Sequence, residues 1–304
     1  MKVLMTGCTG HAGRNALDHF VNHGHEVHAL VRPHNISNLK NRKNVKWIAG
    51  DFSDSEIISE SAYHCDAVVH IGASHDEEME RLDANFIASV AKAFNKTGKV
   101  FITTSASVVY NDTNGVPRDE SEPIKNPHPL RAWRAQHDLD VVGLSDQGIR
   151  GASVRPGLIY GNAGGWLTGL IFRARKSGKS LHIGEGKNLV SSVHVNALSD
   201  LYLKIVTNGS AQGIYNAASD EVTCSKDYAT LIADYFGPNI EVVCWPLEEA
   251  REEMGELADL SCIECIITSE RARSELGWIP IAPSVATELS VGSYRSNELI
   301  PYSH

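Results

Sequence analysis

Three glycines spaced three residues apart, Gly7, Gly10 and Gly13, follow a short apolar run near the start of the chain. The first lets a strand turn sharply, the second lets backbone approach a pyrophosphate, and the third lets the next helix pack against the sheet. That helix begins with unpaired N–H donors and a partial positive charge, and a protonated imidazole in the loop would also favour a phosphate. The spacing therefore predicts a dinucleotide-binding segment, the glycine cradle, formed by Thr6, Gly7, Thr9, Gly10, His11, Ala12 and Gly13.

Arg32 follows the apolar run Glu26–Val31. NAD-binding folds usually carry an acidic residue there, which binds the ribose 2′-hydroxyl. A guanidinium can instead pair with a 2′-phosphate through a bidentate, charge-assisted contact, so the sequence favours NADP(H) over NAD(H). The alternative interpretation is a solvated surface arginine.

Two further strand ends offer residues for the cofactor, although each alone is also compatible with an ordinary turn. One follows the third apolar run, where an adenine could be held, and the other follows the fourth run, where small residues leave space. The predicted contacts at these ends are Asp51, Phe52, Gly72 and Ala73.

Short apolar runs near Val3, Val27, Val45, Val68 and Val100 alternate with helical periodicity through the first half of the chain. That alternation predicts an α/β fold with a Rossmann-type, doubly wound parallel sheet, whose strands end along one edge. Residues 1–160 are expected to form mainly this dinucleotide-binding domain. Residues 161–304 are expected to form mainly a smaller, discontinuous substrate-binding cap, with some segments returning to the sheet.

Composition narrows the class of partner. A net charge of -9 over 304 residues argues against a nucleic-acid or anionic-membrane surface, and no apolar run is long enough to cross a bilayer. The six cysteines are scattered, which suits a reduced, cytoplasmic compartment, and Cys262 and Cys265 lack a second pair that would complete a zinc site. We therefore expect a small-molecule substrate and no metal.

Several segments together carry a resemblance to a known family. They are Thr6–Gly13, Asp51, Ile71–Ala73, Thr104–Ser107, Arg155–Gly157 with Tyr160–Gly161, Val193–Val195, Tyr215–Asn216 and Ser269–Ala272 leading to Leu276–Trp278. On these segments the chain resembles the extended short-chain dehydrogenase/reductase family, which includes sugar-nucleotide epimerases, dehydratases and hydroxysteroid dehydrogenase-like enzymes. Many members are dimers, so the resemblance allows a homodimer.

The resemblance implies that Ser105 hydrogen-bonds a substrate oxygen, that a tyrosine moves a proton, and that a lysine four residues later holds the nicotinamide ribose and lowers the tyrosine pKa. That tyrosine–lysine pair is missing. The two positions are Leu130 and Arg134, and no tyrosine in the chain is followed by lysine at the fourth residue. The chain is thus expected to be an atypical member.

Four side chains remain as candidates for the chemistry. Arg134 can donate to ribose hydroxyls or a substrate carboxylate, although it stays charged near pH 7; the alternative is a solvated helix residue. Ser105 can steady a carbonyl oxygen or an oxyanion, or it caps a turn. Tyr110 and His128 are candidate replacement acids, or they support packing and loops.

Three functions remain open at this stage. The first is an NADP(H)-dependent oxidoreductase in which hydride moves to a small organic substrate and an unusual group supplies the proton; conjugate reduction of an activated alkene would suit. The second is a redox-neutral cyclase, isomerase or lyase on the same fold. The third is a non-catalytic NADP(H)-binding sensor or partner protein.

Overall fold

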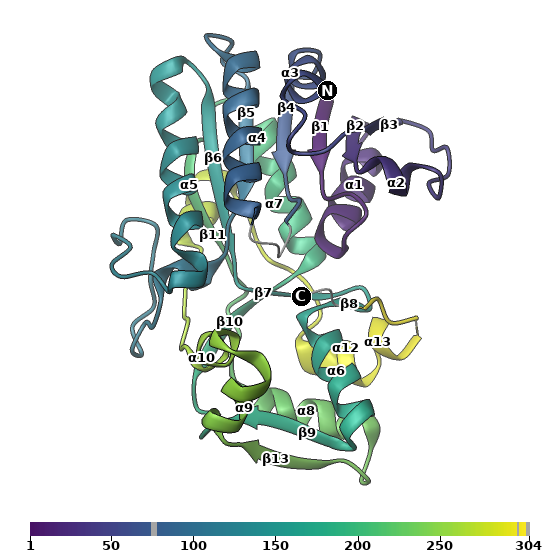
Figure 1. The fold of residues 1–304 in the computed structure, drawn as a ribbon, viewed down its shortest axis with the longest axis vertical. Coiled ribbons are helices and arrows are strands. Elements are labelled where there is room, and N and C mark those ends of the chain that lie inside the picture. The colour runs from purple at the N-terminus through teal and green to yellow at the C-terminus, as the bar shows by residue number, and fades with distance from the viewer. Residues whose placement is uncertain (74–77, 297, 302–304) are drawn as a thin grey trace.

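The computed structural model describes residues 1–73, 78–296 and 298–301. A seven-stranded parallel sheet lies at its centre, in the order β11-β6-β5-β4-β1-β2-β3 (Figure 1). Its strands are β1 (Lys2–Thr6), β2 (Glu26–Val31), β3 (Val45–Ala49), β4 (Ala67–His70), β5 (Val100–Thr104), β6 (Arg150–Pro156) and β11 (Gly213–Ala217). The order reverses between β1 and β4, where α/β sheets bind ligands. The prediction of a doubly wound Rossmann-type sheet is confirmed.

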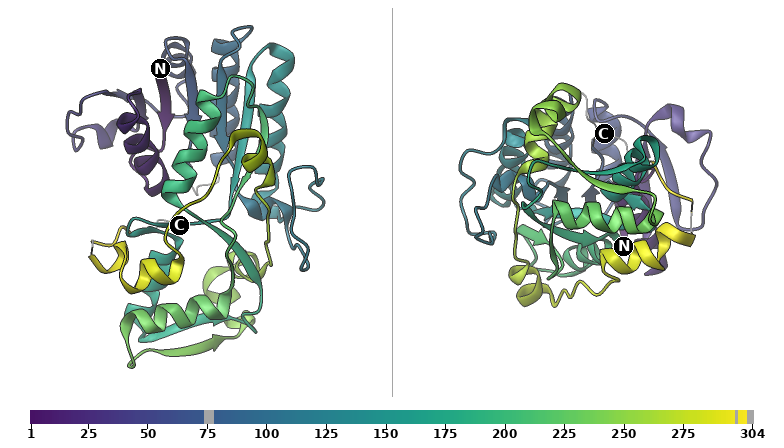
Figure 2. Two further views of the ribbon diagram at one scale, coloured as in Figure 1. Left: turned by 180° about the vertical axis from the view of Figure 1, so that it is seen from behind. Right: turned by 90° about the horizontal axis from the view of Figure 1, so that it is seen from below.

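Helices cover both faces of this sheet because alternate strand residues point to opposite sides. Val3 and Met5 of β1 pack toward α1 (His11–Asn22) and α7 (Val195–Thr207), whereas Leu4 packs on the other face. The left view of Figure 2 shows the molecule from behind, and there α7 lies in front of the sheet. The helices on the other face are α3 (Ser55–Tyr63), α4 (Met79–Phe94) and α5 (Ala132–Gly143).

The second half of the chain builds a smaller part, the cap, beyond the carboxyl ends of the central strands (Figure 1). Its two sheets run β12-β10-β7-β8 and β13-β9. The strands are β7 (Leu158–Gly161), β8 (Gly164–Gly165), β9 (Lys179–Ile183), β10 (Leu189–His194), β12 (Val222–Cys224) and β13 (Glu241–Trp245). Because β11 and α7 lie between cap elements in sequence but pack with the central sheet, the chain crosses between the two parts more than once.

Short helices complete the cap and its connections. The cap helices are α6 (Trp166–Ser177), α8 (Ser225–Phe236), α9 (Leu247–Met254), α10 (Glu256–Cys262), α12 (Val285–Ser290) and α13 (Ser293–Ser296). The remaining elements are α2 (Pro33–Ile36), α11 (Glu270–Leu276), η1 (Ser107–Tyr110), η2 (Pro129–Arg131) and η3 (Leu144–Gln147). Within the described ranges, none of the helices combines the length and apolar character needed to cross a membrane.

Candidate functional site

The glycine cradle joins β1 to α1 in the geometry that its spacing predicts. Gly7 has φ 73° and lies so close to the segment after β4 that an added Cβ would come 2.7 Å from the Gly72 nitrogen. A Cβ at Gly13 would collide with the carbonyl group of Gly7. No side chain caps α1, so its first N–H groups remain open to an oxygen ligand.

Thr6 and Phe52 hold the second wall of the cradle. The Thr6 hydroxyl oxygen accepts hydrogen bonds from the N–H groups of Ile71 (3.1 Å) and Gly72 (3.0 Å). The Phe52 ring lies against Gly72, where a Cβ would come 2.6 Å from its Cζ, while the next residue, Ala73, is exposed. These residues give the cradle a fixed apolar side and an open edge.

The His11 side chain is turned toward the cap. Its Nε2–H donates to the Gly161 carbonyl over 2.8 Å, and burial lowers the pKa of the imidazole to about 4. A group with that pKa is neutral near pH 7, so it does not supply the positive charge that the sequence suggested for a phosphate. The backbone of His11 still belongs to the open end of α1.

The loop that His11 contacts has a strained backbone and is fastened by the last described helix. Ala163 adopts φ 56°, an uncommon value for a residue with a side chain. The hydroxyl of Tyr294, from α13, accepts from the Gly161 N–H (2.8 Å) and donates to the Gly164 carbonyl (2.6 Å). The loop beside the cradle is therefore held from both ends of the chain.

Arg32 and Asp51 follow the neighbouring strands β2 and β3. The Arg32 Nε lies 3.8 Å from the Asp51 Oδ2, and both side chains are exposed, at 50% and 38%. Asp51 also accepts from the Ser53 N–H over 3.2 Å, which fixes its loop. The two predicted cofactor residues are thus brought together at the open edge of the sheet.

Leu130 lies in η2, and Arg134 lies one turn further along, in α5. The Arg134 guanidinium donates to the Thr104 carbonyl over 3.2 Å and stacks on the Trp133 ring, 4.4 Å from its centroid. Burial lowers the pKa of Arg134 from its usual range, with a nearby carboxylate, Asp83, opposing the shift. Arg134 is therefore a partly buried cation at the carboxyl end of β5, which is not the solvated alternative.

The Ser105 hydroxyl forms a hydrogen bond inside the protein. It is buried, and its hydroxyl donates to the Asp138 Oδ2 over 3.1 Å. Asp138 also accepts from Ser153 (2.5 Å) and from the Arg155 Nε (2.8 Å). In this arrangement the Ser105 proton faces the protein interior, so the predicted contact with a substrate oxygen requires breaking the bond to Asp138.

Tyr110 is part of the same buried network and not an exposed acid. Its hydroxyl donates to Asn216 Oδ1 (3.1 Å) and accepts from Arg155 (2.8 Å). Burial raises the pKa of the phenol, which the adjacent Arg155 only partly opposes. Of the two roles that the sequence left open, this geometry favours the supporting one, in which Tyr110 holds Arg155 and Asn216.

His128 keeps an available proton. Its Nδ1 accepts from the Leu130 N–H over 3.3 Å, which caps η2, and the side chain is half-buried. A neutral imidazole that accepts at Nδ1 carries its proton at Nε2. Of the two replacement acids considered, His128 is the one whose proton is not held by an internal acceptor in the described residues.

Asp138 is a residue that the sequence analysis missed, although a signal for it exists. It stands four residues after Arg134, so both lie on one face of α5. A carboxylate on the sheet-facing side of a helix needs a buried cation, and Arg155 at the end of β6 supplies it.

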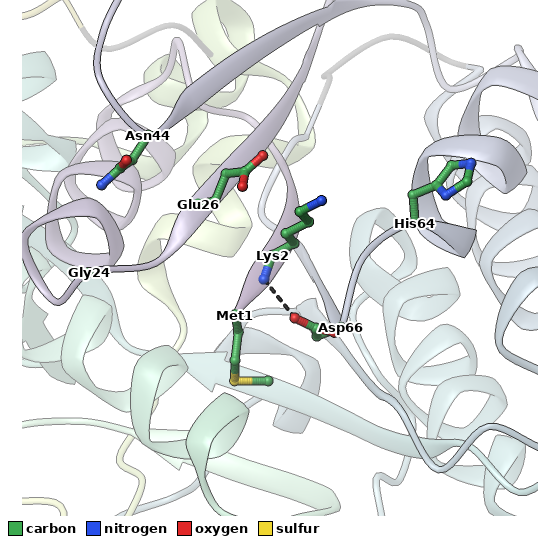
Figure 3. Close-up of a pocket in the computed structure, with 7 residues that line it drawn as sticks. All are labelled: Met1, Lys2, Gly24, Glu26, Asn44, His64 and Asp66. Carbon is green, nitrogen blue, oxygen red and sulfur yellow. Dashed lines mark hydrogen bonds between the residues drawn. The ribbon is translucent and has the colours of Figure 1, made fainter.

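A shallow hollow at the other end of the sheet is not part of this site. It is lined by Met1, Lys2, Gly24, Glu26, Asn44, His64 and Asp66 (Figure 3). There the Lys2 backbone N–H donates to Asp66 over 2.7 Å. Ligands of open α/β sheets bind at the carboxyl ends of strands, and Lys2 begins β1.

Comparisons with known proteins identify the family of the chain. A model of the NAD dependent epimerase/dehydratase family matches residues 3–218. An uncharacterized protein of Schizosaccharomyces pombe is 27% identical over 97% of this chain and 100% of its own length. The 2-alkyl-3-oxoalkanoate reductase of Stenotrophomonas maltophilia is 24% identical, over 92% of this chain and 95% of the relative.

A solved structure shares the fold. It is DesIV, a dTDP-glucose 4,6-dehydratase from Streptomyces venezuelae with NAD and TYD bound, with a TM-score of 0.80 and 17% identity over 98% of both chains. The resemblance to extended short-chain dehydrogenases/reductases is thereby confirmed. With more than half of its residues matched by the family model, the chain belongs to the NAD dependent epimerase/dehydratase family.

Proposed function

We propose that this protein is an NADP(H)-dependent reductase that transfers hydride to a small organic carbonyl compound or activated alkene without a catalytic tyrosine. The observation that carries the proposal is the glycine cradle at the β1–β4 switch point, with Arg32 at the neighbouring strand end. A relative that aligns over 95% of its own length is a 2-alkyl-3-oxoalkanoate reductase, which supports reduction of a carbonyl group.

The residues present fit a dinucleotide. Gly7 and Gly13 leave no room for a Cβ, and the uncapped start of α1 offers N–H donors to a pyrophosphate. Arg32 would pair with a 2′-phosphate, and Phe52 would lie beside the adenosine half. Bound NADPH would supply a hydride from its nicotinamide ring.

Arg134 would stabilise negative charge at the reacting end of the cofactor. It is a permanent cation whose burial strengthens its electrostatic effect on an oxygen of the ribose or the substrate. Conjugate reduction suits this arrangement because a cation can stabilise an enolate without an adjacent strong acid.

His128 would deliver the proton that Leu130 cannot. Its Nδ1 is engaged with the Leu130 backbone, so the Nε2–H is the atom available to a substrate oxygen. Histidine is the side chain that most often transfers protons as a general acid or base in enzymes.

The test is incubation of the protein with NADPH and a panel of 3-oxo acids, ketones and enoates, with absorbance at 340 nm followed beside product analysis. We expect NADPH consumption matched by a product two hydrogens heavier. Product without net NADPH consumption would instead establish the redox-neutral alternative. Cofactor binding with no turnover across the panel, and a partner retained only when NADPH is present, would support the sensor alternative.

A further inference from the structure

Asp83 of α4 is a buried carboxylate with a histidine on each oxygen. Its Oδ1 accepts from the His70 Nε2 and its Oδ2 accepts from the His137 Nδ1, both over 2.7 Å. All three residues are less than one-tenth exposed. Burial opposes ionisation of Asp83, but the two imidazole hydrogen bonds outweigh it and hold the pKa of the carboxyl well below its usual range.

The direction of the hydrogen bonds follows from this carboxylate. Because an ionised Asp83 can only accept, His70 carries its proton at Nε2, and its Nδ1 becomes an acceptor. The Thr6 hydroxyl lies 2.7 Å from that Nδ1 and donates to it. A proton on Nδ1 would instead add a third donor to the Thr6 oxygen and leave the hydroxyl hydrogen without its acceptor.

Thr6 connects His70 to the glycine cradle through hydrogen bonds. With its hydrogen directed at His70, the hydroxyl oxygen accepts from the N–H groups of Ile71 and Gly72. Gly72 is the residue whose backbone closes on Gly7, at a separation that admits no Cβ. The wall of the cradle is therefore placed by a chain of hydrogen bonds that begins at Asp83.

Aromatic packing and α5 make the arrangement rigid. The His70 ring stacks on Phe86, with centroids 4.1 Å apart and an interplanar angle of 13°. On the other side of Asp83, His137 lies edge-on to Trp133, with centroids 5.2 Å apart. The Arg134 guanidinium stacks on the same Trp133 ring. Asp83 thus joins the cradle to the helix that bears Arg134.

We propose that Asp83 is a positioning residue of the dinucleotide site, which fixes Thr6 and Gly72 through His70 without touching the cofactor itself. This inference rests on the proposed function, since it concerns the same dinucleotide.

The test is the NADPH dissociation constant of Asp83→Asn, measured by calorimetry. The amide has a donor where the carboxylate had only acceptors, so one of the two histidines must change tautomer. When that histidine is His70, the Thr6 hydroxyl loses its acceptor. We expect about ten- to hundredfold weaker binding. Asp140→Asn, an exposed change on α5, is the matched control and should bind like the unsubstituted protein.

A cofactor-free readout accompanies the affinity. In the unsubstituted protein, the ¹⁵N spectrum of the His70 imidazole should show a protonated Nε2 and an unprotonated Nδ1, and in Asp83→Asn this pattern should change or broaden. The pair Thr6→Val and Thr6→Ser tests the next link without altering Asp83. Binding should be weakened in the valine variant and largely retained in the serine variant.

The outcomes separate the two proposals. Unchanged NADPH affinity of Asp83→Asn, beside an altered His70 spectrum and a lower melting temperature, would make Asp83 merely structural and overturn this inference alone. If Asp83→Asn does not fold or keeps the His70 pattern, equal affinities of Thr6→Val and Thr6→Ser would overturn it equally. Failure of the unsubstituted protein to bind either dinucleotide would overturn the proposed function together with this inference.

Discussion

The Asp51 carboxylate lies 3.8 Å from the Arg32 Nε, across the ends of two adjacent strands. An ion pair of that length between exposed groups adds little to stability. It does orient the guanidinium at the edge where the ribose of a dinucleotide would lie. Arg32 is therefore held in place but remains open to a stronger partner such as a phosphate.

Arg32→Ala should remove most of a preference for NADPH over NADH. A charge-assisted hydrogen bond contributes about 1.5–3 kcal/mol, so we expect NADPH binding to weaken about ten- to hundredfold while NADH binding changes little. Calorimetric titration with both cofactors measures this. Lys43→Ala, which removes an exposed cation from the next loop, is the control. Equal affinities for the two cofactors in the unsubstituted protein would refute the NADPH preference.

Leu130→Tyr combined with Arg134→Lys should raise the rate of simple ketone reduction. The tyrosine adds a dissociable proton beside the reacting end of the cofactor, and a lysine one turn later lowers its pKa. The pH profile of kcat should gain a new alkaline dependence. Leu130→Phe with Arg134→Lys has the same ring without the hydroxyl and should show neither change. Identical kinetics of the two double variants would contradict a vacant proton-donor position at Leu130.

Tyr110→Phe should lower stability more than catalysis. The change removes one hydrogen-bond partner from Asn216 and one from the buried Arg155, which costs about 1–3 kcal/mol of unfolding free energy. Urea unfolding and steady-state kinetics on the same preparation would measure both effects. A large fall in kcat at unchanged stability would instead assign Tyr110 the proton-transfer role considered from the sequence.

His11 should make the protein less stable as the pH falls from 6.5 toward about 4. Its folded pKa lies below its unfolded value, so the folded state prefers the neutral ring. The stability from this group is complete above pH 6.5 and is lost on acidification through that interval. Denaturant unfolding across the interval should show a steeper loss for the unsubstituted protein than for His11→Gln, which does not titrate. Parallel curves would show that His11 is not responsible.

The fold could be predicted because its signals are local. The cradle spacing lies within Thr6–Gly13, and the expected strand Glu26–Val31 coincides with β2. Alternating apolar residues and glycine spacing report backbone geometry directly, whatever the rest of the chain does.

The chemistry of the site could not be predicted as well because it depends on contacts distant in sequence. His11 is 150 residues from the carbonyl that its ring binds, and the fold directs that ring away from a phosphate. Ser105 and Tyr110 look reactive in sequence, yet Asp138 and Arg155 engage them in the interior. No sequence pattern in the first half of the chain predicts which group a buried hydroxyl will hydrogen-bond.

The fastening of Gly161 and Gly164 by Tyr294 affects how the protein is made. A ribosome delivers the turn at residues 161–164 about 130 residues before the tyrosine that holds it. The nascent chain must therefore carry that turn without its neighbour, and a shortened product lacking α13 would leave the left-handed backbone at Ala163 without its support.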